Sequence, residues 1–125
     1  MLVYGFIGDE SRFIEIDDSL QSMQDFVGGL IEKVGLTPNI DLICNEEGLI
    51  NGSEPRVMLI EDGHFQNCII MGDCFVCRHD GKGNFESIKE TDLPIIKSRL
   101  FHLKGNELKM LGILFLLSCS EEEGR

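Results

Sequence analysis

Basic residues are scarce in this sequence. Its 125 residues contain 11 Lys and Arg against 22 Asp and Glu, which gives a formal net charge of -11. The shortage is concentrated in residues 1–62, where 13 acidic residues accompany three basic ones. Because binding to a phosphate backbone needs Lys and Arg that displace counterions, this balance disfavours direct binding to DNA or RNA. It favours a protein partner, and a basic one on electrostatic grounds.

Targeting and membrane signals are lacking as well. The first residues have no basic start, and their apolar run ends at Asp9 and Glu10, which is not the pattern of a secretion signal. The apolar run at 110–119 is about half of the roughly 20 residues that span a bilayer. The five cysteines are odd in number and scattered, unlike a disulfide framework. We therefore expect a cytoplasmic protein with reduced thiols and no membrane contact.

Short apolar runs that contain β-branched and aromatic residues predict strands. A length of 125 residues leaves room for one core. Gly72 and Asp73 predict a tight turn or a bulge between two of the runs, and residues 57–60 fit a strand or a helical turn equally well. The predicted strands are 2–7, 12–16, 40–44, 68–71, 74–78 and 85–88.

A regular apolar spacing predicts an amphipathic helix over 19–34. Gly28 and Gly29 inside it cost about 1 kcal/mol each relative to Ala, so close backbone approach to a sheet is expected to compensate. A second helix is predicted over 91–103. The fold class is therefore α+β, a mainly antiparallel sheet packed by the first helix. Its apolar stripe consists of Leu20, Met23, Phe26, Val27, Leu30, Ile31 and Val34.

The end of the chain differs in composition from the rest. Residues 105–125 form a tail that is first apolar and then acidic. We predict a single domain over 1–104 and interpret the apolar part of the tail as a last strand or a docking helix.

A cysteine pair with zinc-like spacing is the most specific motif. Cys74 and Cys77 are separated by two residues, with His79 close by, and thiolates and imidazole are ligands that zinc prefers. The intervening residues read as a strand, on which side chains three apart point to opposite faces. We therefore predict no metal and no cofactor, and buried thiols instead.

A thiol-dependent enzyme is an alternative interpretation. Cys44 or Cys77 would be the nucleophile, activated by one of the three histidines, His64, His79 or His102. No pattern in the sequence places a histidine beside either thiol. Because no other catalytic constellation is recognisable, we expect a protein that is not an enzyme.

The candidate binding residues are Asp41, Asn45, Glu46 and Glu47, which lie on one predicted strand and in the turn after it. Grouped carboxylates can support acid/base chemistry or an oxygen-ligand cation site, whereas adjacent acids in a turn are commonly solvated. Both interpretations are open at this point.

Four segments, 15–17, 28–32, 42–48 and 70–76, together carry a family resemblance in their order and spacing. The sequence resembles the domain-of-unknown-function family 3846 from residue 13 to about residue 100. The resemblance implies a small protein or module carried by phages, plasmids and conjugative elements of bacteria, with no established activity. Residues 52–56 and those beyond 103 depart from the family pattern.

These observations favour a non-enzymatic accessory protein of a mobile genetic element that binds a protein partner through an acidic surface. One alternative is a nucleic-acid-mimicking inhibitor of a host defence protein, in which carboxylates imitate phosphates. The other is the thiol-dependent enzyme.

Overall fold

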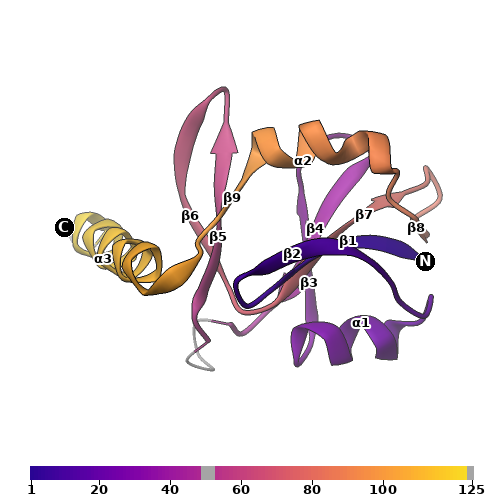
Figure 1. The fold of residues 1–125 in the computed structure, drawn as a ribbon, viewed down its shortest axis with the longest axis horizontal. Coiled ribbons are helices and arrows are strands. Elements are labelled where there is room, and N and C mark those ends of the chain that lie inside the picture. Colours follow the sequence, from indigo (N-terminus) through magenta and orange to yellow (C-terminus); the bar gives the residue numbers. More distant parts are fainter. Residues whose placement is uncertain (49–52, 124–125) are drawn as a thin grey trace.

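The structure is a computed structural model that describes residues 1–48 and 53–123, with the side chains of Asn67 and of residues 115–123 outside the description. Its strands pair only in antiparallel fashion and form two sheets, accompanied by helices (Figure 1). The predicted α+β class is confirmed. The single sheet that we expected is instead divided in two.

Sheet A carries most of the opening segment. Its strands follow the order β2, β1, β7, β4, β3, so that β2 and β3 are its two edges. Their bounds are β1 Leu2–Ile7, β2 Glu10–Glu15, β3 Ile31–Gly35, β4 Ile40–Asn45, β7 Cys74–His79, and the short β8 Phe85–Glu86 paired to β7.

Sheet B consists of three strands in the order β6, β5, β9. The bounds are β5 Pro55–Glu61, β6 His64–Met71 and β9 Leu100–His102. Residues 57–60, which fitted two structures in the sequence, are strand. Gly72 adopts φ 81° and, with Asp73, leads from β6 in sheet B to β7 in sheet A. The alternative of a bulge within one longer strand is therefore wrong, and the two residues connect strands of different sheets.

The first helix is shorter than predicted. Helix α1 spans Leu20–Val27, and Gly28 ends it in the left-handed conformation at φ 81°. Since only glycine adopts that conformation without strain, the helix stops there, and the chain then forms β3. Leu30, which belonged to the predicted stripe, is 58% exposed. The predicted helix over 19–34 is therefore wrong beyond residue 27.

The second helix is also shorter than the predicted 91–103. A 3-10 turn at Glu90–Asp92 precedes α2, Leu93–Arg99. Leu100 pairs with Leu59 of β5, so residues 100–102 extend into strand β9 instead of continuing the helix. Asp92 anchors the start of α2, since its carboxylate accepts two hydrogen bonds of 2.7 Å from the Arg78 guanidinium.

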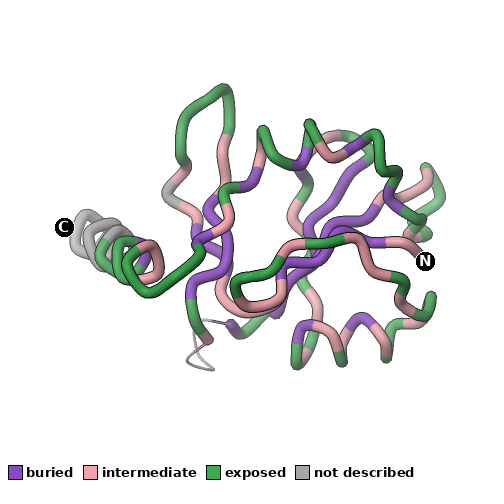
Figure 2. Tube along the Cα trace, viewed as in Figure 1, coloured by how far each residue is buried: buried purple, intermediate pink, exposed green. Residues whose placement is uncertain are grey.

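The layers pack through three apolar clusters. Helix α1 covers one face of sheet A, through Met23, Val27, Ile43 and Phe75 among others. Sheet B and α2 cover the other face, and α3, Gly105–Glu123, packs on the far side of sheet B. Figure 2 shows the buried residues concentrated along the central strands. The start of the predicted tail is thus a docked helix, while the side chains of its acidic end lie outside the described residues.

Candidate functional site

Asp41, the first predicted binding residue, lies inside the protein. It is 1% exposed, on the face of β4 that is covered by α1. Its carboxylate Oδ2 is hydrogen-bonded to Nδ1 of His79 on β7. The side chain that pairs with Asp41 is therefore a neighbour within sheet A.

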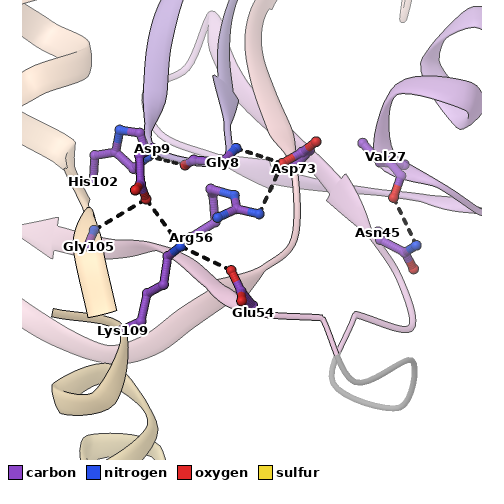
Figure 3. Close-up of polar contacts among 10 residues, drawn as sticks. All are labelled: Gly8, Asp9, Val27, Asn45, Glu54, Arg56, Asp73, His102, Gly105 and Lys109. Carbon is purple, nitrogen blue, oxygen red and sulfur yellow. Dashed lines mark hydrogen bonds and ion pairs between the residues drawn. The ribbon is translucent and has the colours of Figure 1, made fainter. Parts of the chain in front are cut away.

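Asn45 is also internal, and its contacts explain its position. Its side-chain Nδ2 donates to the carbonyl of Val27 at 3.0 Å (Figure 3). Its Oδ1 accepts from the backbone N–H of Glu47 at 2.7 Å. A Cβ on Gly29 would lie 2.9 Å from Asn45 Nδ2. Asn45 thus joins the end of α1 to the turn after β4, and the second glycine allows this close approach.

Glu46 and Glu47 are exposed, and the structure places them beside a third carboxylate. Together with Glu32 of β3, they line a cavity of about 210 Å³. Its apolar walls come from Cys44 of β4 and from the end of β6, at Ile69, Ile70 and Met71. We call this cavity, with its carboxylates and apolar walls, the acidic cleft. Glu32 and the β6 residues were missed in the sequence, because only sheet pairing and layer packing bring them to residues 46–47.

Cys74 and Cys77 lie on opposite faces of β7, as their spacing on a strand predicts. Cys74 packs in the cluster between the two sheets, whereas Cys77 packs in the cluster under α1. Burial, the largest cause, raises the pKa of Cys44 and that of Cys77 to about 12 each. Since the thiolate is the nucleophilic form, these environments oppose thiol catalysis at neutral pH.

No metal cluster occurs among the residues whose side chains are described. In that part of the chain, no group of three His, Cys, Asp or Glu side chains is arranged to hold an ion. Within the same part, no helix combines the length and apolarity needed to cross a bilayer.

A polar junction ties the β1–β2 turn to sheet B and α3 (Figure 3). The Gly8 N–H donates to Asp73 at 3.0 Å, and His102 Nε2 donates to the Gly8 carbonyl at 2.8 Å. Asp9 accepts from the Gly105 N–H at 3.2 Å and pairs with Lys109 at 3.1 Å.

Arg56 is the buried cation of this junction. Its side chain is 8% exposed, and its Nη2 pairs with Asp73 at 3.1 Å. Its Nε and Nη1 are buried without a hydrogen-bond partner among the described residues. In the described part of the chain, Arg56 forms its ion pair with Asp73 alone.

His102 makes the junction sensitive to pH. Burial is the main cause that holds its pKa below the ordinary 6.5, and the charges of Lys104 and Arg56 act in the same direction. The hydrogen bond to Gly8 and the charge of Asp9 oppose that shift. Because Nε2 donates to a carbonyl, the neutral ring carries its lone pair on Nδ1, which is buried without a partner in the described structure.

We expect acid to destabilise the protein through His102. The unfolded chain binds the proton more readily than the folded one, so this contribution is complete above about pH 6.5 and is lost as the pH falls below it. Each tenfold difference in proton affinity corresponds to about 1.4 kcal/mol. Urea unfolding from pH 5 to 8 should show a smaller loss in His102→Gln, whose amide can still donate to Gly8. An equal loss in both proteins would contradict this assignment.

Comparison with known proteins finds a family. The family model described as Domain of unknown function (DUF3846) matches residues 6–100. No curated protein and no solved structure matches the chain.

Proposed function

The chain belongs to the DUF3846 family, whose function is unknown, and on the geometry of the acidic cleft we propose that it is a protein-binding module that holds a basic segment of a partner protein. The observation that carries the proposal is the convergence of Glu32, Glu46 and Glu47 on a cavity with apolar walls. Lysine and arginine side chains combine an apolar stem with a charged head, and this cleft offers a surface for each part.

The edge of sheet A adds a second recognition element. Strand β3, which carries Glu32, ends the strand order of that sheet. An extended peptide can add to such an edge through backbone hydrogen bonds, while side-chain pockets supply specificity. A partner segment lying along β3 would bring alternate side chains to the carboxylates of the cleft.

The same proposal includes the role of an accessory protein, without enzymatic activity, for a mobile genetic element. The family resemblance supports this context, and the raised thiol pKa values argue against the thiol-dependent alternative. The partner contacts would then supply the whole function.

Imitation of a nucleic acid has weaker support. It needs carboxylates arranged along one face, as phosphates are. Exposed acids of the first half are instead spread over several elements, for example at Glu15 on β2, Asp25 on α1 and Glu61 at the end of β5. Only part of this charge gathers in the acidic cleft.

The proposal predicts selective binding of short peptides that alternate Lys with Leu. Fluorescence anisotropy with labelled seven-residue peptides should show tighter binding of the Lys/Leu peptide than of the Glu/Leu peptide. Exposed charge pairs contribute up to about 1 kcal/mol each, so the double variant Glu46→Lys/Glu47→Lys should lose about tenfold in affinity.

The matched control changes the same charge at the other edge of the sheet. Glu10→Lys/Glu15→Lys lies on β2, also with both side chains exposed, and should retain the affinity within about twofold. Equal losses in the two double variants would mean that net charge alone attracts the peptide, and the proposed site would be wrong.

A further inference from the structure

A second cleft lies at the opposite edge of the two sheets. The acidic cleft is bordered by β3 and β6, whereas the second cleft is bordered by β2 and β9, the other edge of each sheet. Its volume is about 390 Å³. Small-molecule sites have volumes of about 300–1,000 Å³ and walls that are mainly apolar. The size of this cleft is therefore that of a small-molecule site.

Rings form much of its wall. Tyr4 and Phe6 of β1, Phe101 and His102 of β9 all line the cleft. Phe6 and His102 meet edge to face, with ring centroids 5.1 Å apart. The aliphatic side chains of Ile96, Leu100 and Leu108 complete the lining. Flat walls of this kind favour a planar aromatic ligand, because ring edges and faces attract one another.

Charge in this cleft is opposite to that of the protein. Lys97 and Lys104 line it and are exposed, while no acidic residue belongs to its lining in the described structure. In a chain with a net charge of -11, this is a local cationic site. Ser11 also lines the cleft, and the Tyr4 hydroxyl donates to its Oγ at 3.1 Å, so the Ser11 hydroxyl keeps its own proton to donate.

The polar junction holds the walls in place. His102 is fixed by its 2.8 Å hydrogen bond to Gly8, and the β1–β2 turn is fixed to α3 through Asp9, Gly105 and Lys109 (Figure 3). These contacts join β1–β2, β9 and α3, each of which contributes residues to the lining of the cleft. A site that is ordered before binding loses less entropy when a ligand enters.

We propose that this cleft binds a small aromatic carboxylic acid, with the ring between the aromatic walls and the carboxylate beside Lys97 and Lys104. The site is separate from the acidic cleft, and it would give the protein a small-molecule ligand in addition to a protein partner.

The test is an NMR titration of the full chain with two probes that share one ring system, naphthalene-2-carboxylate and naphthalene-2-carboxamide. We expect saturable amide shifts at Ser11 and over residues 97–104, and at least about fivefold tighter binding of the carboxylate, in line with charge pairs at an exposed rim. The variant Lys97→Gln/Lys104→Gln should remove this preference.

A matched control removes two lysines elsewhere. Lys33→Gln/Lys82→Gln changes the net charge equally at exposed positions on β3 and after β7, and it should keep the preference. Three results would overturn the proposal: no saturable shifts at millimolar probe, equal affinity for both probes, or shifts confined to the exposed apolar residues Met110, Leu111 and Leu114 of α3.

Discussion

Replacing Asp73 by alanine is expected to destabilise the protein by about 3 kcal/mol. The substitution leaves the Arg56 guanidinium buried without the carboxylate of its ion pair. The variant also loses the acceptor of the Gly8 N–H. Nε and Nη1 of Arg56 already lack a hydrogen-bond partner in the described structure, so the substitution removes the ion pair that the guanidinium makes there. Urea unfolding followed by circular dichroism measures the change.

The control removes the cation instead of the anion. Arg56→Met keeps the apolar stem and deletes the buried donors, so its cost is expected to stay below about 1 kcal/mol. In the double variant Asp73→Ala/Arg56→Met, no cation remains to be buried alone. That variant should be about 2 kcal/mol more stable than Asp73→Ala. If the two single effects simply added, the buried charge would not be the cause.

Replacing Asn45 by alanine is expected to cost about 2 kcal/mol, because one buried and one partly buried hydrogen bond are lost together. One holds the last carbonyl of α1 and the other fixes the turn at Glu47. Glu47→Ala, which changes only an exposed side chain of that turn, should stay within about 0.5 kcal/mol. Thermal and urea unfolding of both variants gives the comparison.

A pH dependence separates the two roles of the Asn45 side chain. Asn45→Asp keeps an acceptor for the Glu47 N–H but sets a carboxylate against the Val27 carbonyl, where Asn45 now donates. The folded state should therefore raise the pKa of that aspartate, and the variant should regain stability as the pH falls and the acid becomes a donor. The measurement is the free energy of unfolding of Asn45→Asp relative to wild type as the pH falls. If this difference does not shift in favour of the variant, the assigned hydrogen bonds are wrong.

Local sequence patterns predicted those strands and helices whose conformation is decided by residues close in the sequence. The strand at Ile40–Asn45 and the separation of Cys74 from Cys77 followed from strand periodicity, which is a property of the backbone. The start of the first helix was predicted to within one residue from polar capping residues, and the structure has Ser19 as the N-cap. The end of this helix was not predicted, since Ile31 and Val34 satisfy helical spacing and also occupy the two faces of β3.

The candidate site could be predicted only in part. The sequence placed Glu46 and Glu47 in a turn after a strand, and the structure shows both side chains exposed there. Asp41 and Asn45 belonged to the same predicted set but lie inside the protein. Alternation along β4 could have indicated this, because both share a strand face with Ile43, which is fully buried.

The sequence by itself predicted the α+β class, the approximate place of most strands and of α1 and α2, and the acidic character of the first half, because periodicity and charge act over a few residues. Tertiary structure decided where α1 ends, how the strands divide between two sheets, and which side chains line each cleft. Glu32 and Ile69 line one cleft, and Tyr4 and Leu100 line the other, only after strands distant in the chain have packed. Such contacts depend on the packing of whole layers, which no short stretch of sequence specifies.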